Sequence, residues 1–149
     1  MRAVVQRVRS ACVSVDGVPV GRIGTGLLAY VGVSRTDGPA DVEYIAGKIA
    51  ELRVFDDEAG KMNRPLADVG GQVLAVSQFT LYGDCRRGRR PSFDQAAPAE
   101  QGRLLFDDVV RALRARGATV ETGTFQAHML VESENDGPVT ILIDSQRSA

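Results

Sequence analysis

Runs of apolar residues, separated by glycines and turn residues, predict a series of strands at the start of the chain. Residues 3–8 and 12–15 read as two strands. Asp16-Gly17 is typical of a tight turn, so we expect the chain to double back through residues 18–23. The nearly continuous apolar run at 27–33 indicates a strand that is buried on both faces.

Two segments carry helical periodicity. Pro39 suits the first turn of a helix, and an apolar stripe follows it at spacings of three or four residues, at Val42, Ile45, Ile49 and Leu52. A second helix is predicted from Pro98 to Gly117, because this glycine suits the position after a helix end. Its apolar stripe consists of Leu105, Val109 and Leu113.

The remaining segments read as short strands and loops. We expect a short strand at 53–55, a polar loop at 56–63 and a buried strand at 72–76. Alternation up to residue 131 predicts a further strand, and a turn at 135–138 is followed by a last strand at 139–143. Hairpin strands with two separated helices favour one α/β domain over residues 1–149, with a mixed sheet and both helices on one side.

Composition narrows the function classes. A formal net charge of -1 argues against a protein that coats long nucleic acid through bulk charge, although a local basic patch remains compatible with it. No apolar run is long enough to cross a membrane or to serve as a secretory signal, so we expect a cytoplasmic protein.

Several common catalytic arrangements are missing from the sequence. His128 is the single histidine, so no His-rich metal site exists, and no nucleophile elbow or nucleotide-binding glycine motif is present. His128 falls in an alternating segment, where a structural role is the more common one, although histidine is also a frequent general base.

The polar stretch Ser77-Gln78-Phe79-Thr80 follows an apolar strand, where side chains and backbone N–H groups can face a pocket. Thr80 as a covalent nucleophile needs an adjacent base, and none is assured. Peptide N–H groups directed at a developing oxyanion are a better use of this turn. The alternative is an ordinary strand end with hydrogen-bonded hydroxyls.

A basic loop comes next. It holds four arginines within five positions around Gly88, namely Arg86, Arg87, Arg89 and Arg90. Such a loop suits contacts with phosphates, and the nearby Phe93 is suited to stack on a base. A solvated charged loop is the alternative. Further along, Gly137-Pro138 read alone predicts an ordinary trans turn, since cis bonds are a minority before proline.

Taken together, these stretches resemble the D-aminoacyl-tRNA deacylase family over essentially the whole chain. The resemblance rests on Ser-Gln-Phe-Thr at 77–80, Gly-Arg-Arg-Pro-Ser-Phe at 88–93, and Asn-Asp-Gly-Pro-Val-Thr at 135–140. Two small departures are Arg87, where a lysine is commoner, and Gln126, where the family segment more often reads Phe-Gly-Ala-x-Met. The second departure bears on the pocket wall.

The resemblance implies a compact β-rich α/β domain with barrel-like β/β/α layers, in a homodimer. It implies hydrolysis of D-aminoacyl-tRNA at the terminal adenosine, and removal of glycine from alanine tRNA, with no metal or organic cofactor. Ser77, Gln78, Phe79 and Thr80 would form the catalytic site, and the four loop arginines would bind tRNA rather than DNA. Gly137-Pro138 would be cis and would enter the partner subunit's active site to exclude L substrates, while the RNA's own 2′-hydroxyl replaces a protein nucleophile.

Two other classes stay open at this point. One is a non-catalytic RNA-binding module that uses the arginine loop, and the near-neutral charge and scarce aromatics count against it. The other is an esterase for small molecules, which the missing nucleophile–base pair disfavours.

Overall fold

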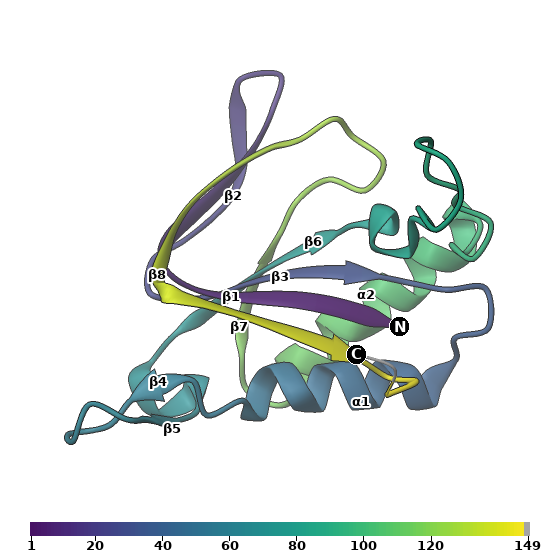
Figure 1. Ribbon diagram of the computed structural model, residues 1–149. Helices are drawn as coiled ribbons and strands as arrows, with labels where there is room; N and C mark the ends of the chain where they lie inside the picture. The colour runs from purple at the N-terminus through teal and green to yellow at the C-terminus, as the bar shows by residue number, and fades with distance from the viewer. Residues whose placement is uncertain (148–149) are drawn as a thin grey trace.

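The computed structural model describes residues 1–147, and its longest strands are the first and the last (Figure 1). β1 (Arg2–Val15) pairs along one edge with β3 (Gly26–Gly32) and then β2 (Val18–Ile23). Its other edge pairs with β8 (Leu130–Asp144). The prediction of two strands at 3–8 and 12–15 was therefore wrong. Exposed polar residues at 9 and 10 interrupt the apolar pattern, yet the backbone pairing continues through them.

The main sheet is mixed and curls toward closure. Its order is β2-β1-β3-β6-β7, with β6 (Gln72–Ser77) parallel to both β3 and β7 (Thr119–Thr122). The far ends of this order approach each other, because a methyl group built on Gly21 of β2 would lie 2.5 Å from the carbonyl oxygen of Thr122. These contacts confirm the expected barrel-like, mixed arrangement.

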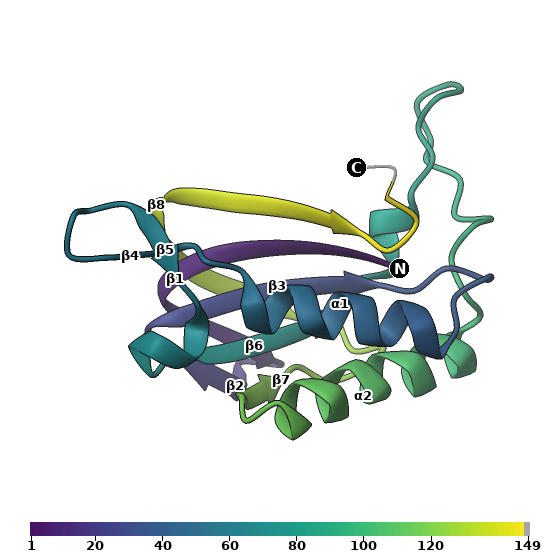
Figure 2. The ribbon, with the colours of Figure 1, turned by 90° about the horizontal axis from the view of Figure 1, so that it is seen from below.

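Both helices cover the same face of the sheet. Figure 2 shows α1 (Pro39–Glu51) and α2 (Ala99–Ala115) side by side against the strands, as predicted. β3 is buried on its two faces: Leu27 belongs to the cluster under the helices, and Leu28 belongs to a second cluster inside the curled sheet. The structure thus has two apolar layers, and the sheet lies between them.

Short elements connect the layers. The polar loop predicted at 56–63 is a small hairpin, in which β4 (Phe55–Asp56) pairs with β5 (Met62–Arg64). The strand expected at 53–55 is reduced to the start of β4. Two 3-10 helices follow, η1 (Leu66–Val69) and η2 (Phe79–Tyr82), the second directly after β6.

The segment before β8 departs from the prediction. Residues 123–129 form a loop, although the sequence pattern predicted a strand there. The apolar alternation is real, since Phe125, Ala127 and Met129 are half-buried while Gln126 and His128 are exposed. These alternating side chains face a cavity instead of a neighbouring strand.

No chain reversal occurs at 135–138, where a turn was predicted. These residues lie within β8, and its register with β1 passes from Thr140 opposite Gln6 to Asn135 opposite Val8. Four β8 residues, 136–139, are therefore set against Arg7 alone. An excess of residues on one strand bends it, and β8 turns sharply at this point (Figure 1).

Candidate active site

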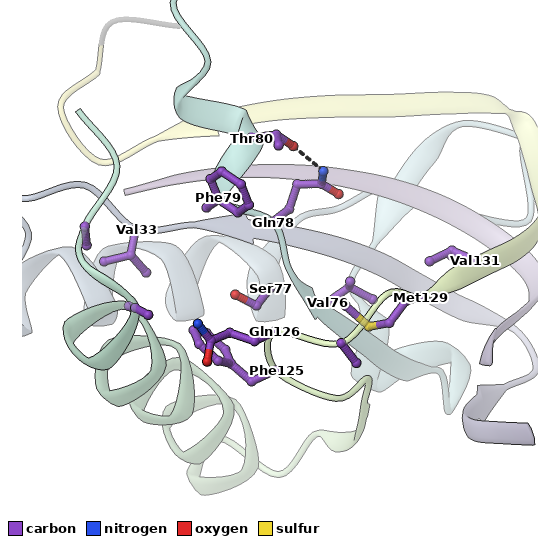
Figure 3. A pocket seen from close by; sticks show the side chains of 14 residues that line it. Val33, Val76, Ser77, Gln78, Phe79, Thr80, Phe125, Gln126, Met129 and Val131 are labelled. Atoms are coloured by element: carbon purple, nitrogen blue, oxygen red, sulfur yellow. Dashed lines mark hydrogen bonds between the residues drawn. The ribbon is translucent and has the colours of Figure 1, made fainter. Parts of the chain in front are cut away.

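A cavity of about 570 Å³ opens between β6, η2, the first turns of α2 and the loop 123–129. Figure 3 shows Gln78, Phe79 and Thr80 on one side, Phe125 and Gln126 on the other, and Ser77 between them. Met129 and Val131 extend the lining toward the apolar interior of the curled sheet. The cavity is thus the open end of that interior.

The Ser-Gln-Phe-Thr stretch lies where the sequence predicts it, at the end of a buried strand. All four residues line the cavity. Ser77 is the last residue of β6, and the backbone N–H of Gln78 donates to the carbonyl oxygen of Val31 at 2.8 Å. The chain then coils into η2, which leaves Phe79 and Thr80 exposed to the cavity and solvent.

Donors in this turn remain available. The backbone N–H groups of Phe79 and Thr80 begin η2, and within residues 1–147 neither donates a hydrogen bond. The Thr80 hydroxyl is engaged, since Gln78 Nε2 donates to Thr80 Oγ1 (Figure 3). Free peptide donors beside a cavity are suited to stabilise a developing negative charge on oxygen.

The opposite wall contains the residue that departs from the family pattern. Gln126 lines the cavity and has a φ of 64°, a left-handed conformation that glycine adopts without strain. Its carboxamide makes no hydrogen bond within the described part of the chain. His128 is exposed and does not line this cavity. Of the two residues, Gln126 therefore shapes the pocket.

The arginine loop projects from the same end of the molecule. Asp84 and Ser92 form a β-bridge at its base. Arg86 binds back to Asp84 through its guanidinium, which lowers the pKa of Asp84 to about 2 and raises that of Arg86. Arg87, Arg89 and Arg90 are exposed and make no ion pair among residues 1–147.

The loop and the cavity are physically joined through two aromatic side chains. Phe93 follows the arginine loop, and its ring meets that of Phe79 edge to face at 5.2 Å between centroids. Phe79 lines the cavity. The base of the arginine loop therefore contacts the rim of the cavity.

Gly137-Pro138 lies elsewhere. Its peptide bond is cis, as the resemblance implies, and both residues are exposed rather than part of the cavity lining of this chain. The buried side chain of Arg7 supports the segment by donating from Nε to the Asp136 carbonyl oxygen at 3.1 Å. Asn135 Nδ2 donates to the backbone of Arg7 and of Val139.

Some residues that line the cavity could not be identified as site residues from the sequence. Val33, Ala97 and Gly102 are ordinary small or apolar residues, and only the fold brings them to the cavity. Phe125 and Ala127 belong to the alternating segment that was interpreted as a strand. Among residues 1–147, no group of three or more His, Cys, Asp or Glu side chains is arranged to hold a metal ion, and no helix is long and apolar enough to span a bilayer.

Known proteins match this chain along nearly its full length. It is 60% identical over 146 residues to the D-aminoacyl-tRNA deacylase of Heliobacterium modesticaldum, covering 98% of this chain and 97% of that protein. It is 61% identical over 148 residues to the D-aminoacyl-tRNA deacylase of Symbiobacterium thermophilum, covering 99% and 98%.

Solved structures share the fold. A protein described as "c-Myc DNA Unwinding Element Binding Protein" superimposes with a TM-score of 0.91 at 39% identity, over 97% of this chain and 98% of that chain. A probable eukaryotic D-amino acid tRNA deacylase gives a TM-score of 0.80 at 21% identity over 95% and 97%, which supports the fold alone. The family model described as "D-Tyr-tRNA(Tyr) deacylase" matches residues 4–144. The chain therefore belongs to the D-Tyr-tRNA(Tyr) deacylase family.

Proposed function

We propose that this protein hydrolyses the ester between a D-amino acid and the terminal adenosine of tRNA, as a cytoplasmic proofreading enzyme. Water adds to the ester carbonyl, and the ribose oxygen leaves with a proton to give free D-amino acid and tRNA. The observation that carries the proposal is the cavity itself, lined by Ser77, Gln78, Phe79 and Thr80. The close relatives named as D-aminoacyl-tRNA deacylases support the same activity.

The protein's role in this scheme is positioning and electrostatic stabilisation. The free N–H groups of Phe79 and Thr80 stabilise the oxyanion that forms at the carbonyl. His128, the single histidine, does not line the cavity, so the proton transfers are assigned to water and to the 2′-hydroxyl of the RNA. An ester is more reactive than an amide, and correct placement supplies much of the remaining acceleration.

Chirality is read by a second subunit in this proposal. Gly137 and Pro138 are exposed, lie outside the cavity of their own chain and sit on the bend of β8. In a homodimer, the partner's copy of this segment supplies a main-chain wall against the side chain of an L-amino acid. Glycine has no side chain to meet this wall, so glycine on alanine tRNA is a second substrate.

The test compares hydrolysis of D-tyrosyl-tRNA, L-tyrosyl-tRNA, glycyl-tRNA for alanine and free D-tyrosine ethyl ester. We expect the D ester on tRNA and the glycyl ester to be cleaved at least tenfold faster than the L ester, a difference of about 1.4 kcal/mol. Cleavage of the free D-tyrosine ethyl ester as fast as D-tyrosyl-tRNA would instead indicate a small-molecule esterase. Light scattering of the same sample checks the homodimer, and a fully active monomer would contradict the shared site.

A further inference from the structure

The arginines of α2, and Arg116 directly after its end, differ in what they bind. Arg111 pairs with Asp108, and Arg116 pairs with Glu43 and Glu51 across the two helices. Arg114 donates to the carbonyl oxygen of Val120 at 2.8 Å. Arg103 is exposed and forms no ion pair with any carboxylate within residues 1–147.

Arg103 instead lies on an aromatic ring at the edge of the cavity. Its guanidinium carbon is 5.6 Å from the centroid of Phe125, which lines the cavity, and its chain neighbour Gly102 lines it as well. Glu100 and Asp107 are one helical turn away on either side, and neither is within ion-pair distance. The guanidinium is therefore held by the ring, while its N–H edge remains free to bind another group.

The cavity has no charge of its own to offer. None of the described residues that line it is charged. A nucleotide that enters must therefore find partners for its phosphate at the rim. The arginine loop provides them on the η2 side, and Arg103, which has no carboxylate partner among residues 1–147, provides a cation on the α2 side.

We propose that Arg103 is a second anion-binding site, specific for the phosphate that precedes the 3′-terminal nucleoside of the RNA substrate. This assignment rests on the proposed function and extends it. Phe125 keeps the planar guanidinium against the rim, and two parallel N–H groups bind two phosphate oxygens, the geometry in which arginine exceeds lysine. The loop arginines bind the backbone further from the end.

The test uses D-tyrosine esterified to the ribose of the adenosine in three carriers. They are tRNA, adenosine 5′-monophosphate with its phosphate free, and adenosine without a phosphate. Arg103→Gln is compared with the wild type, with Arg103→Lys, and with Arg111→Gln as a matched control on the exposed side of the same helix. We expect Arg103→Gln to raise KM roughly five- to tenfold for the two phosphorylated substrates, with kcat unchanged. KM for D-tyrosyl adenosine should stay the same, and Arg103→Lys should recover part of the affinity.

Other outcomes are decisive as well. An equal rise in KM for D-tyrosyl adenosine would show that Arg103 acts only by holding Phe125, and unchanged KM for all three would show a solvated side chain. Either result would overturn the phosphate site. If the wild type cleaves none of the esters, the proposed function fails. The role of Arg103 is then tested separately, by the salt dependence of binding to uncharged tRNA. Arg103→Gln should flatten the salt dependence of that binding by about 0.7–0.9 in log–log slope, whereas an unchanged slope overturns the inference.

Discussion

Arg2 donates a hydrogen bond from Nη1 to the carbonyl oxygen of Leu81 at 3.0 Å, and so ties the first strand to the 3-10 helix beside the cavity. The same guanidinium lies 4.5 Å from the centroid of the Tyr82 ring and donates from Nε to Asp144 at 3.2 Å. Burial of Tyr82, with Asp37 and Asp144 nearby, raises the pKa of its hydroxyl to about 12. Two of these contacts hold η2 (Leu81 and Tyr82), and the third anchors the guanidinium to the end of β8.

Replacing Arg2 should therefore damage catalysis more than binding. Because η2 carries the free N–H groups of Phe79 and Thr80, Arg2→Ala should lower kcat about ten- to a hundredfold, with a smaller change in KM. Arg2→Lys should recover only part of this activity, since an ammonium lacks the planar fork. Steady-state kinetics check the prediction, with the exposed Arg22→Ala as control. A change confined to thermal stability would contradict it.

Thr80 should not form a covalent intermediate. Its hydroxyl accepts a hydrogen bond from Gln78, and the single histidine, His128, does not line the cavity. Thr80→Ala should keep measurable deacylation, weakened about tenfold if the hydroxyl orients water or substrate. Mass spectrometry of enzyme quenched during turnover should show no aminoacyl adduct. An ester trapped on Thr80, or complete loss of activity in Thr80→Ala with activity retained in Thr80→Ser, would refute this prediction.

The loop arginines should contribute unequally to tRNA binding. Arg86 is already engaged by Asp84, whereas Arg87, Arg89 and Arg90 are without such a partner among residues 1–147. Neutralising these three with glutamine should reduce the log–log salt slope of tRNA binding by about 0.7–0.9 for each phosphate that they neutralise in the wild type, and Arg86→Gln should change it less. Fluorescence titrations at several salt concentrations measure the slopes. Single-stranded DNA serves as competitor, and an equal preference for DNA would contradict specific tRNA binding.

Gly137→Ala should reduce the preference for D over L substrates. The φ of Gly137 is 134°, and a methyl group there would lie 2.7 Å from Val139 Cγ2 and 3.3 Å from Arg7 Nη2. The backbone must then shift, and the wall moves with it. We expect the ratio of D to L cleavage, which does not depend on the folded fraction, to fall at least tenfold. Ser133→Ala, exposed on the same strand, should leave the ratio unchanged; a retained ratio in Gly137→Ala would exclude this segment from selectivity.

Gln126→Gly should leave stability unchanged or raise it by at most about 1 kcal/mol, because the relieved left-handed strain is partly offset by the entropy of glycine in the unfolded chain. His128→Gly in the same loop should destabilise by roughly 0.5–1 kcal/mol, since no strain is relieved there. Urea unfolding midpoints compare the stability of the two variants, provided that the slope of unfolding free energy against urea concentration is the same for both. A clear loss of stability in Gln126→Gly would show that its side chain is a structural support.

The sequence predicted well those elements whose structure follows from the apolar periodicity of their own residues. The stripe Val42, Ile45 and Ile49 and the apolar run at 27–33 bury the surfaces that their periodicity indicates. The two errors within β1 and β8 occur where contacts with segments distant in the chain determine the local structure. Residues 9 and 10 read as a break, but pairing with β8, as at Ser10 opposite Glu134, keeps β1 continuous. Residues 135–138 read as a turn, but Arg7, far away in the chain, holds them as a bulge in β8.

The candidate site follows the same division. The polar stretch at 77–80 could be located because it interrupts an apolar strand. Its opposite wall could not, because alternation in 125–131 has the same period whether the side chains face a sheet neighbour or a cavity. Arg103 lies on the Phe125 ring because the loop 123–129 places that ring there. The local sequence around Arg103 does not predict this contact.

The pairing of β1 with β8 also constrains how the chain is made. β1 ends at Val15 and its partner begins at Leu130, so the chain as far as β8 must leave the ribosome before this edge of β1 is covered. Until then, a long strand with unpaired N–H and C=O groups is exposed to other nascent chains. Non-local strand pairing of this kind also slows folding. Newly synthesised molecules should accordingly depend on holding chaperones more than a helical protein of equal length.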